Sequence, residues 1–245
     1  MENDTFEAQL ALRLQPSHSH IMYQTWSRLL FLHWRWNVAE LQSKIPDGLR
    51  IETYDGSAWL GVVPFFMRSI RPRYLPAVPW ISWFLELNVR TYVIDKQGRP
   101  GVWFFSLDCN QPTAVWAARR FFYLPYMHAR MTAHEDTAGF IHYTCQRSGT
   151  SQVSTFQYAI DKSVSFAEPR TLDFFLLERY LLHSRTPHGL RVGQVHHVPY
   201  PISQVKLERW DDHTLLLNGF SSPGRPPDHV CGSMGVRVQV YPIRP

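Results

Sequence analysis

Three polar side chains of different chemistry alternate along one short stretch of this chain. Glu86, Asn88 and Arg90 are each separated by one apolar residue in the run F-L-E-L-N-V-R-T-Y-V at 84–93. Because successive side chains of a β-strand point to opposite faces, these three share one face of the predicted strand. A carboxylate, an amide and a guanidinium form a ligand-binding surface if that face lines a cavity. If the face meets water, it is an ordinary solvated strand.

The chemistry of these side chains points to a small acid as ligand. A carboxyl group held among aromatic rings loses hydration, which raises its pKa and suits Glu86 to proton transfer. Arg90 can bind a carboxylate through two parallel hydrogen bonds. The two residues lie about 13 Å apart along a strand, so each needs a different partner or a ligand. His33 and Arg35 share a face of a second predicted strand at 29–36 and are further candidate ligand-binding residues. For His33 the alternative is a structural role.

Other chemical signatures are missing from the sequence. It has neither of the two glycine-rich nucleotide-binding patterns, G-x-G-x-x-G and G-x-x-x-x-G-K-[ST]. It also has no H-E-x-x-H zinc motif and no nucleophile elbow around Ser233. The histidine pairs 18/20 and 196/197 have no third ligand nearby in sequence, so we expect no metal site and no cofactor. The arginines at 68, 71 and 73 are typical of a solvated loop, and no motif predicts nucleic-acid binding.

Composition predicts a folded, reduced protein. The chain has 245 residues, of which 44% are hydrophobic and 18% charged, and its net charge is +5. Three dispersed cysteines give no disulfide framework. The start M-E-N-D-T-F-E lacks a signal-peptide pattern, and no apolar run is long enough to span a membrane. We therefore expect a cytoplasmic protein with no membrane association.

Strands dominate the predicted elements. We expect strands at 29–36, 84–93, 101–108, 126–133, 139–147 and 153–160, and in the last third at 193–198, 203–210, 214–217 and 235–241. Asp55-Gly56 predicts a hairpin between 49–54 and 57–67, with Pro64 at an edge or bulge. Helices are predicted after Asn37, at 112–123, and at 171–184 with Thr171 as N-cap.

These elements predict an α+β fold. Helices are too few for regular βαβ alternation, so we expect a mainly antiparallel, strongly curved sheet, closed into a cone or barrel with two or three packed helices. Residues 1–20 are predicted to form a loosely ordered N-terminal arm, and residues 21–245 a single domain.

Several motifs, taken in order, resemble the YqjF-like family of uncharacterised bacterial proteins. They are L-L-F-L-H-W at 29–34, D-G-x-A-W-L-G-V-V-P-F at 55–65, E-L-N-V-R-T-Y-V at 86–93, G-V-W-F-F-S-L-D at 101–108 and L-P-Y at 124–126. That family looks like a branch of the acetoacetate decarboxylase-like superfamily. The resemblance implies a cone or barrel with a small-molecule cavity inside, faced by Glu86 and Arg90.

The resemblance also implies a departure in chemistry. Decarboxylases of the superfamily form a Schiff base on a buried lysine, and Tyr126 stands where that lysine is expected. The four lysines of the chain, at 44, 96, 162 and 206, lie in predicted turns, at a helix end or on an outward face. We therefore expect no Schiff-base decarboxylase.

Two functions remain open from the sequence. One is a binding protein for a small carboxylate or ketone, held by Arg90 and oriented by Glu86, Asn88 and Tyr126. The other is an enzyme that uses Glu86 and Tyr126 for acid–base chemistry on a small keto acid or related metabolite. Unpaired sheet edges and exposed aromatic residues favour a homodimer.

Overall fold

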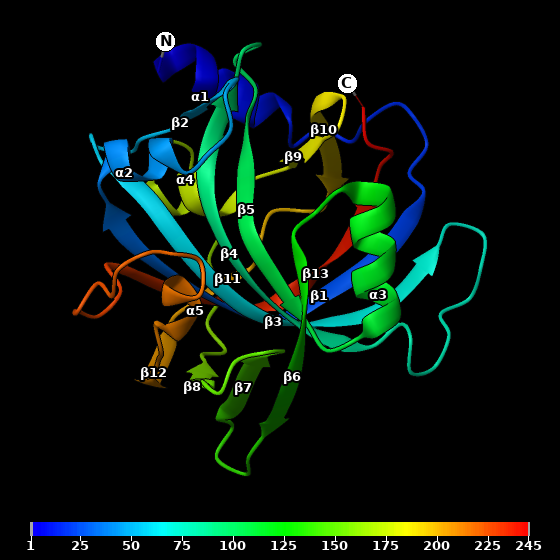
Figure 1. Cartoon of the computed structure of the whole chain (residues 1–245), viewed down its shortest axis with the longest axis vertical. Coiled ribbons are helices and arrows are strands. Elements are labelled where there is room, and N and C mark those ends of the chain that lie inside the picture. The colour runs from blue at the N-terminus through cyan, green and yellow to red at the C-terminus, as the bar shows by residue number, and fades with distance from the viewer. Residues whose placement is uncertain (1, 245) are drawn as a thin grey trace.

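The protein is mostly β-sheet with a few short helices (Figure 1). The structure, a computed structural model, describes residues 2–244, and the side chains of residues 5–244. In chain order the elements are α1 (Glu2–Ala11), β1 (Met22–Trp36), α2 (Val38–Ser43), β2 (Leu49–Ile51), β3 (Ala58–Pro72), β4 (Phe84–Asp95), β5 (Pro100–Cys109), α3 (Pro112–Ala117), a π-helix (Ala118–Phe122), β6 (Tyr126–Glu135), β7 (Ile141–Arg147), β8 (Ser154–Ile160), α4 (Leu172–Leu177), β9 (Leu181–Thr186), β10 (Gly189–His196), β11 (Ile202–Ser203), β12 (Val205–Arg209), α5 (His213–Leu216) and β13 (His229–Val240).

Seven strands form a ring of pairings, in the order β5, β9, β10, β13, β1, β3, β4 and back to β5. Within the ring the β5–β9 pairing is parallel and the other pairings are antiparallel. The β5–β6 pairing, which lies outside the ring, is also parallel. From β5 the sheet also continues outward through β6, β7, β8 and β12 (Figure 1). The predicted α+β class, with a mainly antiparallel sheet and few helices, is confirmed.

Local signals placed many elements correctly. The strand at 84–93 is β4, and Asn37 caps α2 by accepting a hydrogen bond from the Glu40 amide. Thr171 caps α4 in the same way, through the Phe174 amide. Each of these signals is short-range, which is why a single sequence reveals it.

The predicted hairpin around Asp55-Gly56 is only half right. Both residues have positive φ and form the two-residue turn, but a single bridge, Tyr54 to Ser57, closes it. The arms then separate: β2 pairs with the end of β4 at 93–95, while β3 pairs with 84–91 of the same strand. The turn depends only on its two central residues, whereas the pairing of each strand depends on residues far away in the sequence.

Two element assignments in the second half of the sequence were wrong. The predicted helix at 171–184 ends at Leu177, and 181–186 form strand β9, which closes the ring between β5 and β10. A continuous apolar run suits a buried strand as well as a buried helix, so its pattern could not separate the two. The predicted strand at 214–217 is instead the short helix α5, whose first amide, at His213, donates to Asp211.

A bulge in β1 shapes the wall of the ring. The β1–β3 register shifts between Ser27 and Leu32, opposite Pro64, which has no amide to donate. On the other side of β1, Gly235 of β13 has φ +135°, and a Cβ there would lie 2.2 Å from the Trp26 carbonyl oxygen. Glycine therefore allows β13 to approach the bulge closely.

The N-terminal segment packs on the body through α1. Gln9 is buried and donates hydrogen bonds to the carbonyls of Phe174 and Glu178. Arg13 lies 3.2 Å from the Glu178 carboxylate. The division of the chain at residue 20 stays a prediction.

Candidate functional site

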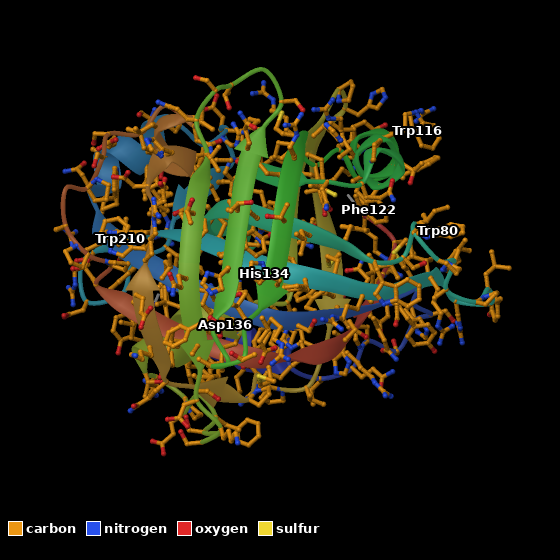
Figure 2. The ribbon with its side chains drawn as sticks, turned by 90° about the horizontal axis from the view of Figure 1, so that it is seen from below. Trp80, Trp116, Phe122, His134, Asp136 and Trp210 are labelled. Atoms are coloured by element: carbon orange, nitrogen blue, oxygen red, sulfur yellow. The ribbon has the colours of Figure 1, made fainter. Side chains whose placement is uncertain are left out.

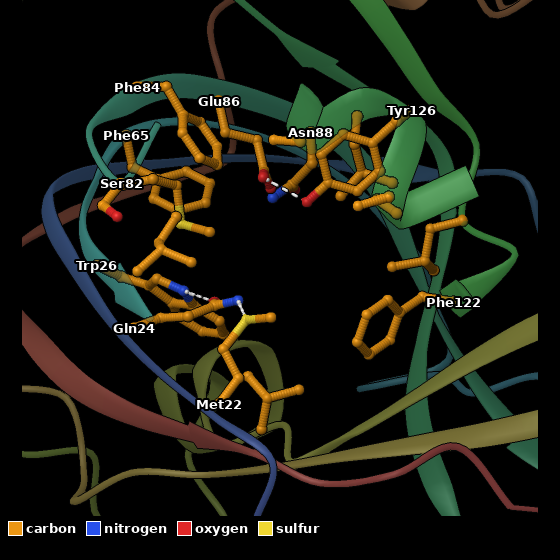
Figure 3. A pocket seen from close by; sticks show the side chains of 18 of the residues that line it. Met22, Gln24, Trp26, Phe65, Ser82, Phe84, Glu86, Asn88, Phe122 and Tyr126 are labelled. Carbon is orange, nitrogen blue, oxygen red and sulfur yellow. Dashed lines mark hydrogen bonds between the residues drawn. The ribbon is translucent and has the colours of Figure 1, made fainter. Parts of the chain in front are cut away.

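A cavity of about 510 Å³ lies between the inner faces of β1, β3 and β4 and the α3–π-helix segment (Figure 3). Most of its lining is apolar. Val78, Ile81 and Trp116 line it and are exposed, so they mark the side where it meets solvent. In Figure 2, Trp80 and Trp116 lie on the same side of the molecule. The lining residues with polar side-chain groups include Gln24, Ser82, Glu86, Asn88, Arg90, Thr113, Tyr126 and Tyr200.

Strand β4 supplies the polar floor of this cavity. Its side chains at 84, 86, 88 and 90 line the cavity, while those at 85, 87 and 89 are in the hydrophobic core on the other face. The alternation predicted from sequence is therefore present in the structure. The cavity-facing polar residues Glu86, Asn88 and Arg90 are each at most 9% exposed.

Glu86 and Tyr126 form a hydrogen-bonded pair at the centre of the floor. The Tyr126 hydroxyl donates to Oε2 of Glu86 over 2.6 Å, as Figure 3 shows. Tyr126 is the first residue of β6, which pairs with the end of β5 beside β4, so the sheet brings together two residues 40 positions apart. No cation neutralises this carboxyl group among the ion pairs of the described residues.

Burial dominates the protonation of this pair. Loss of hydration raises the pKa of Glu86 to about 7, against the opposing effect of hydrogen bonds from Tyr126 and Asn88. Burial, with the Glu86 charge beside it, raises the pKa of Tyr126 well above its ordinary value, so the phenol stays protonated. Glu86 can therefore accept or release a proton near neutral pH, while Tyr126 acts as a donor.

Asn88 and Arg90 have buried polar atoms without protein partners. These atoms are Oδ1 of Asn88 and Nε of Arg90. The Arg90 guanidinium makes a long contact of 3.4 Å to the Leu176 carbonyl and lies over the rings of Phe31 and Tyr92. No carboxylate pairs with Arg90 in the part of the chain that the structure describes. Its charge and one N–H are thus free for a ligand in the cavity.

His33 and Arg35 do not line the cavity. His33 is fully buried behind it and hydrogen-bonds Tyr92 and His229. Arg35 lies on the surface, stacked over Trp59 and 4.0 Å from Asp55. The structure thus brings Glu86, Asn88, Arg90 and Tyr126 together and leaves these two outside.

The sequence prediction missed the cavity residues contributed by the first part of β1. Trp26 donates to Gln24 over 2.8 Å, and both side chains line the wall opposite Glu86 (Figure 3). The predicted strand began at residue 29, because M-Y-Q-T-W-S alternates more weakly than the apolar run after it. The alternation of Met22, Gln24 and Trp26 was the signal available.

The lysines and potential metal ligands lie apart from this site. None of the four lysines lines the cavity; Lys44 donates to the Gly219 carbonyl, and Lys206 pairs with Glu208 on the surface. Within the described residues, no three histidine, cysteine or acidic side chains gather in a metal-binding arrangement. None of the described helices has the length and apolar content needed to cross a bilayer.

Comparison with known proteins gives the chain its family. Residues 23–237 match DUF2071, described as an uncharacterized conserved protein. The chain belongs to this family. It is also 39% identical over 213 residues to the uncharacterized protein YqjF of Bacillus subtilis, covering 86% of this chain and 87% of that one. The resemblance inferred from the sequence motifs is confirmed.

Solved structures share the fold at low sequence identity. Acetoacetate decarboxylase from Legionella pneumophila superposes with a TM-score of 0.62 at 10% identity, over 95% of this chain and 91% of that chain. The enduracididine biosynthesis enzyme MppR, complexed with the condensation product of pyruvate and imidazole 4-carboxaldehyde, gives 0.62 at 12% identity, over 93% and 90%. The fold is therefore acetoacetate decarboxylase-like.

Proposed function

We propose that this protein binds a small carboxylate or ketone in the cavity, with Arg90 holding the charged end. The observation that carries the proposal is the buried guanidinium of Arg90, which has a free Nε and no carboxylate partner among the described residues. An unpaired buried charge is costly, so a ligand carboxylate would satisfy a need that the protein leaves open. Asn88, Glu86 and Tyr126 would orient the rest of the ligand.

The shape and lining of the cavity narrow the ligand further. The polar groups cluster on β4 and Tyr126, whereas Trp26, Phe65 and Phe122 line much of the remaining wall (Figure 3). A ligand with an acidic head and an apolar body matches this division. MppR, which shares the fold, has been solved with pyruvate bound, which supports a keto acid as the ligand class.

A second candidate function is acid–base catalysis by the Glu86–Tyr126 pair. The observation that favours it is the Glu86 pKa of about 7, which suits proton removal next to a ketone near neutral pH. In this function Glu86 takes the proton and Tyr126 donates a hydrogen bond to the developing oxyanion. With Tyr126 at the expected lysine position and no lysine in the cavity lining, we propose no Schiff-base step.

The other expectations from sequence accompany this proposal. The ring of strands would close as a cone around the ligand, and two copies would form a homodimer in the cytoplasm. No cofactor, nucleic acid or membrane has a part in it.

A thermal-shift experiment tests the binding proposal. Wild type, Arg90→Ala and Glu86→Gln are screened with pyruvate, acetoacetate, 3-oxooctanoate, benzoate and phenylpyruvate. A ligand that binds the folded state raises the melting temperature by mass action. We expect at least one acid to stabilise wild type, and Arg90→Ala to lose about 1.5–3 kcal/mol of binding free energy, since it loses a hydrogen bond to a charged group.

The matched control is Arg35→Ala, which removes a surface arginine outside the cavity. It should keep the full ligand-induced shift. Equal shifts in wild type and Arg90→Ala would contradict the role of Arg90, and an absence of any shift across the panel would contradict the binding proposal.

Exchange of hydrogen for deuterium tests the catalytic candidate. Wild type in D₂O should replace the hydrogens beside the ketone of the binding keto acid faster than the buffer alone, as followed by proton NMR. Glu86→Gln should reduce this rate by about 10²–10⁴-fold, the range typical of a general base. A variant that exchanges as fast as wild type would leave binding as the function.

A further inference from the structure

Four side chains outside the cavity form a continuous chain of hydrogen bonds. The Tyr92 hydroxyl lies 2.8 Å from Nε2 of His33, and Nδ1 of His33 lies 2.9 Å from Nδ1 of His229. Nε2 of His229 then lies 2.7 Å from Oδ1 of Asp173. These residues come from β4, β1, β13 and α4, so the chain crosses three strands and ends on a helix.

The chain runs from the interior to the surface. Tyr92 and His33 are fully buried, the His229 side chain is 12% exposed, and the Asp173 side chain is 44% exposed. Only the Asp173–His229 end can therefore exchange protons readily with solvent. Burial and the neighbouring His229 and Arg90 hold the pKa of His33 well below its usual value, so His33 stays neutral.

The bonding pattern assigns a direction to every proton in the chain. Ionised Asp173 can only accept, so His229 carries its proton on Nε2 and its Nδ1 is an acceptor. His33 must then donate from Nδ1, which leaves its Nε2 to accept the Tyr92 hydroxyl proton. The hydrogen bond from His229 also lowers the pKa of Asp173, which keeps the carboxylate ionised.

The buried end of the chain meets the arginine of the cavity. The guanidinium carbon of Arg90 lies 5.8 Å from the centre of the Tyr92 ring, and the Arg90 charge opposes the burial that raises the pKa of the Tyr92 hydroxyl. Because Tyr92 gives its proton to His33, its oxygen lone pairs remain available to Arg90 as acceptors. Arg90 is thereby held without a carboxylate, and its positive charge stays available to the cavity.

We infer that Tyr92, His33, His229 and Asp173 form a relay that positions Arg90 for its ligand, so that the proton positions in the relay are coupled to ligand affinity. The inference rests on the proposed function, since it concerns the same arginine. These four are positioning residues, because none of them lines the cavity.

A relay with the opposite proton positions would disfavour the ligand. If His229 carried its proton on Nδ1, it would donate to His33, and His33 would carry its own proton on Nε2. The Tyr92 oxygen would then accept from His33, and its hydroxyl hydrogen would turn towards Arg90, where it opposes the guanidinium. Ligand affinity should therefore fall in a variant that reverses the proton positions.

The charged and titratable groups around His229 come from several elements. Asp173 faces it from α4, His33 from β1, and the positive charge of Arg90 lies behind His33. On β13 the neighbouring thiol of Cys231 is buried, and burial raises its pKa well above the usual value. Just before β13, Asp228 is paired with Arg225.

Asp173→Asn tests the relay at its exposed end, where the change is least disruptive to folding. An asparagine that donates its amide proton to His229 forces the opposite proton positions along both rings. Long-range ¹H–¹⁵N NMR of the ligand-free protein reads the tautomers directly. We expect Nδ1–H on His33 and Nε2–H on His229 in wild type, both reversed in Asp173→Asn.

Binding of 3-oxooctanoate at pH 7.5 then tests the coupling. We expect about tenfold weaker binding in Asp173→Asn than in wild type, and we expect Tyr92→Phe to abolish this difference, because it removes the hydroxyl through which the relay reaches Arg90. The matched control is Asp136→Asn, because Asp136 holds His142 over 2.7 Å in an equivalent pair on the β6–β7 hairpin. It should leave both tautomers in the relay and the affinity unchanged.

The two measurements separate the inference from the function on which it rests. Nε2–H on His33 in wild type would overturn the relay whether or not any ligand binds. If the tautomers are reversed in Asp173→Asn as expected, but the variant binds the ligand as tightly as wild type, the coupling is overturned. If no acid of the panel binds wild type, the proposed function fails and the coupling fails with it, while NMR still decides the direction of the relay.

Discussion

Two buried carboxylates occupy adjacent rungs of the same strand pair and have opposite surroundings. In the β4–β5 register, Cys109 is opposite Glu86 and Asp108 is opposite Leu87. Asp108 is fully buried and binds Arg147 through two hydrogen bonds of 2.6 and 2.8 Å. Glu86, on the cavity side, has a phenol as its partner instead of a cation.

The comparison separates a structural acid from a chemically adjustable one. Glu52 and Glu178 follow the Asp108 pattern, since each is buried against an arginine, Arg179 and Arg13 respectively. In each pair the arginine ties the carboxylate to another element. Burial raises the pKa of Glu52, but the charge and hydrogen bond of Arg179 oppose that rise. Glu86 alone among these four is left to a neutral donor, so its protonation can change within the physiological range.

Removing the cation from the structural acid should have the largest effect. Arg147→Met leaves Asp108 buried and uncompensated, which should lower the free energy of unfolding by about 3–5 kcal/mol. Denaturant unfolding at pH 7.5 measures this loss. Glu86→Gln should cause no loss under the same conditions, and a loss as large as that of Arg147→Met would mean that Glu86 is also a structural charge.

The pH dependence of stability should show the raised pKa of Glu86. Its pKa rises from 4.5 in the unfolded chain to about 7 in the folded protein. Folding then favours the protonated form, so the contribution of Glu86 is complete below pH 4.5 and is lost as the pH rises to 7. This loss amounts to about 3 kcal/mol at 1.36 kcal/mol per pKa unit.

Unfolding of wild type and Glu86→Gln from pH 4 to 8 isolates this term. The variant should match wild type at pH 4 and become the more stable protein by about 3 kcal/mol at pH 8. Parallel pH profiles would show that Glu86 is hydrated or paired in solution.

The smallest expected change in stability follows from removing the hydroxyl of Tyr126. Tyr126→Phe removes a donor to the Glu86 carboxylate, so the pKa of Glu86 should rise further and stability should fall by about 1 kcal/mol. Carboxyl ¹³C NMR follows the titration of Glu86. Tyr143→Phe is the control, because the Tyr143 hydroxyl donates to the backbone carbonyl of Glu86 and leaves the carboxylate alone. Equal shifts in both variants would contradict a specific role for Tyr126.

The sequence predicted those parts of the site that depend on local alternation. Glu86, Asn88 and Arg90 share the cavity face of β4 because strand geometry alone places them there. Tyr126 was added only through the family resemblance, since its contact with Glu86 spans 40 residues.

Contacts between residues on distant strands could not be predicted from the sequence. Arg147 and His229 reach their partners across 39 and 196 residues, and no periodicity encodes such pairings. The helix expected at 171–184 failed for a related reason. Its second half pairs with β5 and β10, and this pairing outweighs local helical preference.

The close approach of Gly235 to β1 has a consequence for how this family can diversify. Any other residue there would force the backbone beside Trp26 to move, and Trp26 lines the cavity. Side chains such as Met22, Met67 and Ile70 also line the cavity, but they can change size without moving a strand. Substitutions of those side chains can therefore change which ligand the cavity accepts, whereas a substitution of Gly235 would change the distance between β13 and β1 and with it the shape of the cavity wall.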